Sequence, residues 1–276
     1  MDSYAESINE HYGKPGLLER MYTFLAGEGK DVNTLTCDDL TAFDEFHIGG
    51  RGETRNLARL VNVHEGVEIL DVGSGVGGPA RTLAGEFAAR VTGLDITEEF
   101  CRVARELTER VGLSDNITFH QGSAMEMPFD DERFDVVWTQ FAAMNINDRH
   151  ALYREMFRVL RPGGSLAIHE VMGASDKPMK FPVLWAADPS ISFVKPARWV
   201  RNELAATGFR EKLWNDLTES SIRWFEEMKG SDQGARSRKA RKTLSGSENF
   251  SESARNVMQN LKDGAINVVQ TIWEKP

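Results

Sequence analysis

The segment EILDVGSGVGGP, residues 68–79, passes from an apolar stretch into a turn rich in glycine. A helical pattern of apolar residues follows from Ala80, so the segment predicts a strand, a tight turn and a helix. Glycines at such a turn let the backbone lie close beneath a ligand, because no Cβ atom stands in the way. The start of the helix also offers unpaired N–H groups. The segment therefore predicts a binding site for a nucleotide-like ligand.

The glycine spacing fits two patterns. Gly73, Gly75 and Gly78 satisfy G-x-G-x-x-G, the fingerprint of dinucleotide-binding folds. Gly73, Gly75 and Gly77 equally satisfy G-x-G-x-G. The turn alone leaves the choice of nucleotide open, so that choice depends on the residues around it.

Composition and charge exclude several classes of protein. The chain has 276 residues, 41% hydrophobic and 27% charged, which favours one large domain or a domain with an inserted cap. A net charge of -9 argues against a nucleic-acid partner. Two cysteines, Cys37 and Cys101, are too few for a disulfide scaffold, and no Cys/His cluster predicts a metal site. Because the sequence shows no secretory signal and no apolar run of roughly 20 residues, we expect a cytoplasmic protein without a membrane span.

Apolar segments alternate with helical patterns over most of the chain. Strands are expected at residues 67–72, 90–96, 116–120, 134–139, 165–171, 209–216 and 265–273. This alternation predicts an α/β fold with an open, Rossmann-like, doubly wound sheet that is mostly parallel. Ligands of such sheets bind outside the carboxyl ends of the strands. Polar residues stand at five of those ends, namely Asp71, Asp95, Ser123, Gln140 and His169.

Two of these acids help to choose the nucleotide. Asp95 lies 20 residues after Gly75, where a carboxylate can accept hydrogen bonds from both ribose hydroxyls. Asp71 lies two residues before the first glycine of the turn. A carboxylate so near a pyrophosphate would repel it, whereas a cationic aminoacyl-sulfonium ligand tolerates it. The pair therefore favours S-adenosylmethionine over a nicotinamide dinucleotide.

The segments FDVV (residues 134–137) and LRPGGSL (residues 160–166) resemble the class I S-adenosylmethionine-dependent methyltransferases. The resemblance runs from about residue 46 to residue 276. It is greatest to the small-molecule group that includes the sarcosine/dimethylglycine, tocopherol and ubiquinone-biosynthesis methyltransferases. It implies that the last strand is antiparallel and lies beside the fifth. Many of that group carry Gly-Asp-Ala after the third strand, whereas this chain has Gly122-Ser123-Ala124, in which Ser123 can still hydrogen-bond adenine.

The resemblance also implies roles for individual residues. The glycine turn would pack against the methionine moiety and the sugar, Asp95 and Ile96 would hold the ribose and adenine, and Gln140 would lie near the methyl donor. No metal is expected. The full set expected to bind S-adenosyl-L-methionine is Asp71, Gly73, Ser74, Gly75, Asp95, Ile96, Ser123, Ala124 and Gln140.

The implied activity is in-line SN2 transfer of a methyl group to nitrogen, oxygen or carbon of a small-molecule acceptor. A general base is needed only if the acceptor loses a proton at or before transfer. His169 is the first candidate and His47 the second, because imidazole titrates near neutral pH. Either histidine can equally be structural. An apolar or aromatic acceptor would suit Phe141, Met144, Trp185 and Phe193, which can equally belong to the core.

The chain is expected to fall into three parts. Residues 1–45 would form a helical lid in which Tyr12 and Tyr22 supply contacts, and residues 46–175 the S-adenosylmethionine-binding core. Residues 176–276 would complete the sheet and carry cap insertions at 176–196 and 217–263. The basic run 236–242 is expected to be a solvated helix face.

Two functions of other classes stay open. The same glycine spacing permits an NAD-dependent oxidoreductase, and a non-catalytic protein could sense S-adenosylmethionine. A macromolecular methyltransferase is disfavoured by the acidic balance of the chain. The sequence carries no indication of the oligomeric state.

Overall fold

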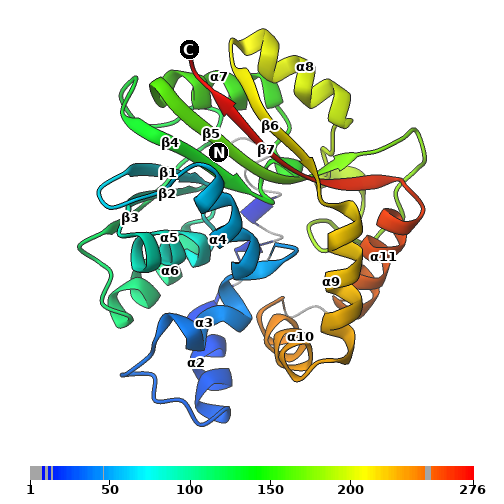
Figure 1. Cartoon of the computed structure of the whole chain (residues 1–276). Helices are drawn as coiled ribbons and strands as arrows, with labels where there is room; N and C mark the ends of the chain where they lie inside the picture. Colours follow the sequence, from blue (N-terminus) through cyan, green and yellow to red (C-terminus); the bar gives the residue numbers. More distant parts are fainter. Residues whose placement is uncertain (1–7, 10–11, 14, 46, 246–249) are drawn as a thin grey trace.

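The computed structural model describes residues 8–276 except 10–11, 14, 46 and 246–249 (Figure 1). Its described residues form one seven-stranded sheet in the order β3-β2-β1-β4-β5-β7-β6. Strands β1 to β5 are parallel, and β7 pairs antiparallel with both β5 and β6. The expected α/β sheet, with an antiparallel last strand beside the fifth, is confirmed. The strands are β1 (Glu68–Val72), β2 (Arg90–Asp95), β3 (Ile117–Gln121), β4 (Phe134–Gln140), β5 (Leu160–Gly173), β6 (Arg210–Asp216) and β7 (Ile266–Glu274).

Strand β5 begins five residues earlier than the sequence pattern indicates. Leu160 already pairs with Phe134, and the register then shifts before Ser165 pairs with Val136. Residues 161–164 therefore bulge out of the strand without ending the pairing.

Helices cover both faces of the sheet (Figure 1). Alternating strand residues point to opposite faces, so Ile69 packs with α4 and α5 on one side while Leu70 packs with α7 and α8 on the other. Full burial of each such side chain stabilises the fold by about 1.5–3 kcal/mol. One layer contains α4 (Gly50–Leu60), α5 (Gly78–Phe87) and α6 (Glu98–Arg110), and the other contains α7 (Arg149–Val159) and α8 (Ala197–Thr207).

Two glycines of the turn after β1 are required by close packing. Gly73 has φ +77°, and a Cβ atom there would stand 2.2 Å from Cβ of Ala142. A Cβ atom at Gly78 would stand 1.9 Å from the carbonyl oxygen of Asp44. The first glycine thus lets the loop after β4 lie against the turn, and the second lets α3 (Cys37–Asp44) pack on the start of α5.

Further helices lie at the ends of the strands, where the site is found. Helix α10 packs against α2 and α3 and against α9 and α11, while α9 and α11 also contact β7. Figure 1 shows α2, α3 and α10 together below the sheet. These helices are α2 (Leu17–Gly27), α3 (Cys37–Asp44), α9 (Thr218–Gly230), α10 (Asp232–Ser245) and α11 (Phe250–Lys262). No helix among the described residues is long and apolar enough to cross a bilayer.

One expectation about these helices is wrong, and another holds only in part, because Arg238, Lys239 and Lys242 of the basic run are exposed. The hydroxyl of Tyr22 donates to Oε1 of Glu106 at 3.1 Å and so faces α6, away from the expected site. The basic run 236–242 is not wholly solvated, because Arg236 donates to the carbonyl oxygen of Asp39 and Arg241 to that of Glu45. The run therefore presents one face to the core.

Candidate functional site

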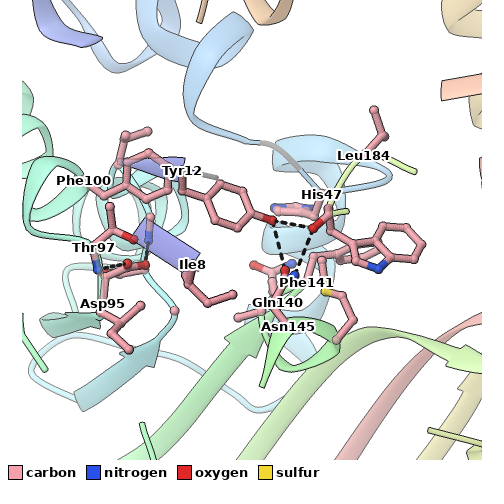
Figure 2. A pocket seen from close by; sticks show the side chains of 18 of the residues that line it. Ile8, Tyr12, His47, Asp95, Thr97, Phe100, Gln140, Phe141, Asn145 and Leu184 are labelled. Atoms are coloured by element: carbon pink, nitrogen blue, oxygen red, sulfur yellow. Dashed lines mark hydrogen bonds between the residues drawn. The ribbon is translucent and has the colours of Figure 1, made fainter. Parts of the chain in front are cut away.

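A cavity of about 570 Å³ opens at the carboxyl ends of β1, β2 and β4 (Figure 2). It receives side chains from the sheet, from the N-terminal segment and from the connection after β5. The expected ligand position outside the carboxyl ends of the strands is where the cavity lies. Every residue expected to bind the cofactor lines it, namely Asp71, Gly73, Ser74, Gly75, Asp95, Ile96, Ser123, Ala124 and Gln140.

Asp71 is a buried carboxyl that faces this cavity. Its side chain is 2% exposed, and its Oδ2 atom has no hydrogen-bond partner among the described residues. Burial raises the pKa of Asp71 to about 8, and repulsion from Asp95 and Glu45 adds to the effect. An unpaired buried carboxylate is costly, and a cationic ligand group would compensate it. The residue therefore fits a positively charged ligand and disfavours a pyrophosphate.

Backbone N–H groups fix the orientation of the Asp95 carboxylate. Oδ2 accepts from the N–H of Gly75 at 2.9 Å, and Oδ1 accepts from the N–H of Thr97 at 2.9 Å (Figure 2). Burial raises the pKa of Asp95, while these two N–H groups oppose the rise. Hydrogen bonds from the side chain of Thr97 and the backbone of Ile96 also lower the pKa of Asp95. The carboxylate is thus fixed where it lines the cavity.

Gln140 is fixed by a buried network. Its Oε1 atom accepts from Nε1 of Trp138 at 2.9 Å and lies 3.1 Å from the hydroxyl of Thr54. Its Nε2 atom lies 3.2 Å from Nδ1 of His169. An amide nitrogen only donates, so Nδ1 of His169 accepts and the imidazole proton is on Nε2. The network sets the direction in which Gln140 faces the cavity.

His169 does not line the cavity, although the sequence places it at a strand end. It is 1% exposed and lies behind Gln140. Burial lowers the pKa of His169 well below its ordinary value, and the nearby His47 lowers it further. The imidazole is therefore neutral near pH 7 and has no direct path to an acceptor.

His47 does line the cavity, but both of its nitrogens face oxygen atoms. Nε2 lies 2.8 Å from Oε2 of Glu45, and Nδ1 lies 3.3 Å from the carbonyl oxygen of Ile48. Burial tends to raise the pKa of Glu45, but the hydrogen bond with His47 and that from Thr82 hold it below its ordinary value. The pair is arranged as a buried imidazole–carboxylate contact.

The residues expected at an acceptor are only partly brought together. Phe141, Met144 and Trp185 line the cavity, whereas Phe193 does not; its backbone N–H donates to the carbonyl oxygen of Met144 at 2.7 Å. Phe141 has φ +51°, a conformation that side chains rarely adopt. Such strain is held in place by surrounding structure and clusters at functional sites. Here it turns the aromatic ring at the end of β4 toward the cavity.

Three further residues at the cavity were not expected as ligands or ligand-holding groups. Asn145 receives a hydrogen bond from the hydroxyl of Tyr12 at 3.0 Å and donates to the carbonyl oxygen of Trp185 at 2.9 Å (Figure 2). Asp44 and Arg241 also line the cavity. Asn145 follows a strand end by five residues, a weak sequence signal, and Arg241 carries none because it arrives from a distant helix. No group of three or more His, Cys, Asp or Glu side chains in the described part of the chain is placed to hold a metal ion.

Residues 70–168 match the family model described as a methyltransferase domain. The methyltransferase GfsG of Streptomyces halstedii is 33% identical over 172 residues, which are 62% of this chain and 60% of that protein. The glycine/sarcosine/dimethylglycine N-methyltransferase of Actinopolyspora halophila is 33% identical over 180 residues, which are 65% of this chain and 32% of that protein. The chain spans between 30% and 60% of the length of the curated relatives it matches.

A solved structure is similar over nearly the whole chain. The geranyl diphosphate C-methyltransferase of Streptomyces coelicolor A3(2), in complex with S-adenosyl-L-homocysteine, superposes with a TM-score of 0.71 at 17% identity. The superposition covers 99% of this chain and 98% of that one. At this identity the likeness shows the fold. The resemblance inferred from the glycine turn and from residues 134–166 is confirmed by these matches: residues 70–168 match a methyltransferase domain, and the chain shares its fold with a solved methyltransferase.

Proposed function

We propose that the protein is an S-adenosylmethionine-dependent methyltransferase that acts on an apolar small molecule. The observation that carries this proposal is the buried carboxyl of Asp71, which lines a largely apolar cavity and whose Oδ2 atom has no hydrogen-bond partner among the described residues. S-adenosylmethionine supplies a methyl group on a cationic sulfonium, and in-line attack by the acceptor leaves S-adenosylhomocysteine. A second, uncharged ligand would suit the apolar part of the same cavity.

The residues present fit the cofactor. Asp71 would face the cationic aminoacyl end, and Asp95 would accept from the ribose hydroxyls. Ser123 and Ala124 line the cavity where adenine is expected. The hydroxyl oxygen of Ser123 already accepts from the N–H of Met125 at 3.1 Å, so its proton is available to a ring nitrogen.

The chain positions the acceptor and removes water from it. Phe141, Met144 and Trp185, with Leu184 and Ile48, form an apolar wall of the cavity. Alignment of the acceptor with the methyl donor in this cavity can lower the free-energy barrier of methyl transfer by roughly 7–11 kcal/mol. Gln140 lines the same cavity as the cofactor residues and this wall, so its fixed amide would orient the reacting groups.

Neither histidine is placed to remove a proton before transfer. His169 is neutral behind Gln140, and His47 has both nitrogens opposite oxygen atoms. This favours an acceptor whose nucleophilic atom attacks without a histidine base. The methylated element, whether nitrogen, oxygen or carbon, is left to experiment.

We further propose that residues 1–45 act as a lid and that 176–196 and 217–263 act as a cap. Tyr12 supports this division, because its hydroxyl lies 3.0 Å from Oδ1 of Asn145 and 3.3 Å from the carbonyl oxygen of Trp185. Packing of α10 on α2 and α3 joins the cap to the lid. Residues 1–7, 10–11, 14 and 246–249 of these segments, and residue 46 of the proposed core, lie outside the described chain. The cytoplasmic location stays a prediction.

Calorimetric titration of the full chain with S-adenosylhomocysteine and with NAD tests the proposal. Binding of S-adenosylhomocysteine without binding of NAD is the expected result. Binding of NAD alone would overturn it and favour an oxidoreductase. Cofactor binding with no methylated product from any acceptor would support the sensor function instead.

A further inference from the structure

Glu170 is a buried acid of β5 that has no part in the proposed binding of the cofactor or the acceptor. Its side chain is 1% exposed. Its Oε2 atom accepts a hydrogen bond from the N–H of Ala143 at 2.7 Å, and its Oε1 atom accepts one from the N–H of Val171 at 3.0 Å. Burial raises the pKa of Glu170 to about 7, while Arg149 and backbone hydrogen bonds, including one from Met144, oppose this rise. The carboxyl group therefore joins β5 to the loop that follows β4.

The loop joined to Glu170 carries part of the apolar wall of the cavity. It contains the short helix η1 (Ala143–Asn145), and both Phe141 and Met144 line the cavity (Figure 2). Phe141 has φ +51°, so the contacts around this loop must hold it in a conformation that side chains rarely adopt. Met144 belongs to the same buried cluster as Trp185, another residue of the wall. A shift of the loop would therefore change the shape of the wall that faces the acceptor.

The first backbone N–H groups of η1 need an acceptor from outside the helix. The N–H groups at the start of a helix have no partner within it, and a buried N–H group without a partner is costly. Ala143 and Met144 are both buried, and Glu170 is the acceptor that β5 offers to them. Hydrogen bonds to an ionised acceptor are also stronger than those to a neutral one. The place of the Glu170 carboxyl group therefore fixes the place of the loop.

Arg149 of α7 provides a positive charge that acts on Glu170. It is 2% exposed, and its Nη1 atom donates to the hydroxyl of Tyr153 at 3.5 Å. Its Nε and Nη2 atoms have no hydrogen-bond partner among the described residues. Removal of the Glu170 charge alone would leave this buried cation uncompensated, which destabilises a fold. A test of the carboxyl group therefore needs a variant that removes both charges.

We propose that Glu170 is a positioning residue that holds the loop after β4, and with it the apolar wall, in the geometry that receives the acceptor. It acts through the N–H groups of Ala143 and Met144 and does not itself line the cavity. This inference rests on the proposed function and extends it, because a residue outside the cavity would set the acceptor side of the site and leave the cofactor side unchanged.

The test compares four proteins. These are the full chain, Glu170→Gln, the double variant Glu170→Met with Arg149→Met, and the control Glu155→Gln. Glutamine keeps the shape of the side chain and one acceptor oxygen, whereas the double variant removes the acceptor without leaving an unpaired charge. Glu155 is a matched control, because its Oε2 atom accepts from the N–H of Met127 at 2.6 Å and so holds a different loop. Thermal melting confirms that each variant is folded.

Three quantities are measured for each protein. Mass spectrometry follows hydrogen exchange of residues 141–146, and calorimetry gives the affinity for S-adenosylhomocysteine. The third is the rate at which trideuterated S-adenosylmethionine labels a metabolite extract, and a dilution series of that extract gives the apparent KM of the acceptor.

The double variant should exchange residues 141–146 about tenfold faster than the full chain and raise the apparent KM of the acceptor about tenfold, the usual effect of losing a charge-assisted hydrogen bond. Glu170→Gln should show smaller changes in the same direction, because one acceptor oxygen remains. Both should bind S-adenosylhomocysteine within twofold of the full chain. Glu155→Gln should change neither the exchange of residues 141–146 nor the KM of the acceptor.

Three results would overturn the inference alone. These are unchanged exchange of residues 141–146 in the double variant, faster exchange with an unchanged KM of the acceptor, and a loss of S-adenosylhomocysteine affinity as large as the rise in that KM. The last result would indicate a general structural role. If the double variant is unfolded, the same criteria apply to Glu170→Gln. If the unaltered chain forms no labelled product, the proposed function itself fails and the inference fails with it.

Discussion

Replacement of Asp71 by asparagine should make the protein more stable at high pH while it weakens the cofactor site. The pKa of Asp71 is raised by burial to about 8 from an ordinary value of 3.8. Between these two values the folded protein keeps a proton that the unfolded chain has lost. By linkage, wild-type stability therefore falls as the pH rises from about 4 to about 8, and this contribution is constant above that range.

The magnitude follows from the width of the window. Each pKa unit corresponds to about 1.4 kcal/mol, so from pH 5 to pH 8 the wild type loses on the order of 4 kcal/mol through this group. Asparagine does not titrate, and the penalty for its buried amide, about 1–3 kcal/mol, is the same at every pH. The stability of Asp71→Asn relative to wild type should therefore rise by about 4 kcal/mol between pH 5 and pH 9. At roughly 2 °C per kcal/mol for a chain of this size, the difference in Tm should grow by about 8 °C.

Melting curves at pH 5 and pH 9 measure this difference directly, with Asp115→Asn as a control at an exposed position. The control should show no pH-dependent change in relative Tm. Titration with S-adenosylhomocysteine at pH 8 should show that Asp71→Asn binds at least tenfold more weakly. A relative Tm for Asp71→Asn that is the same at both pH values would refute the reasoning, because Asp71 would then ionise as it does in the unfolded chain.

Three other substitutions test separate parts of the site. Gly73→Ala should destabilise the protein by about 2–3 kcal/mol or more in denaturant melts, because its Cβ atom would stand 2.2 Å from a neighbouring Cβ atom at φ +77°. Gly66→Ala, at φ +80° in open space, should cost only about 1 kcal/mol, and equal losses would contradict the packing argument. His169→Gln should lower kcat, because His169 helps to orient Gln140. It should leave the shape of the pH–rate profile between pH 6 and pH 8 unchanged, whereas loss of one limb of that profile would assign His169 as the base. Tyr12→Phe should raise the KM of the acceptor severalfold at unchanged cofactor affinity, because it removes the hydrogen bond between the lid and Trp185. The control Tyr22→Phe should change neither the KM nor the cofactor affinity. Equal effects of the two substitutions would count against the lid.

Local patterns in the sequence predict the sheet and the cofactor side of the site. Asp71 and Asp95 are placed by the strands that precede them, because parallel strands bring their carboxyl ends to one edge. The antiparallel orientation of β7 was implied by the family resemblance, because the periodicity of a strand does not tell whether it runs parallel or antiparallel to its neighbours.

Side-chain contacts across the sheet could not be predicted in this way. The sequence pattern places both Gln140 and His169 at strand ends, but β5 continues past His169 to Gly173, and His169 lies behind Gln140. Phe193 is aromatic, as a residue of an acceptor wall would be, but it does not line the cavity. Its backbone N–H instead donates to the carbonyl oxygen of Met144. Arg241 reaches the cavity only because α10 packs on α2 and α3, a long-range arrangement that its own basic run does not encode.

The most direct test of methyl transfer uses S-adenosylmethionine with a trideuterated methyl group. The full chain would be incubated with this cofactor and a metabolite extract, and products separated by polarity and analysed by mass spectrometry. We predict an apolar product that carries the labelled methyl group and an equal amount of S-adenosylhomocysteine. Cofactor binding without any labelled product, across apolar and polar fractions alike, would contradict the proposed methyl transfer.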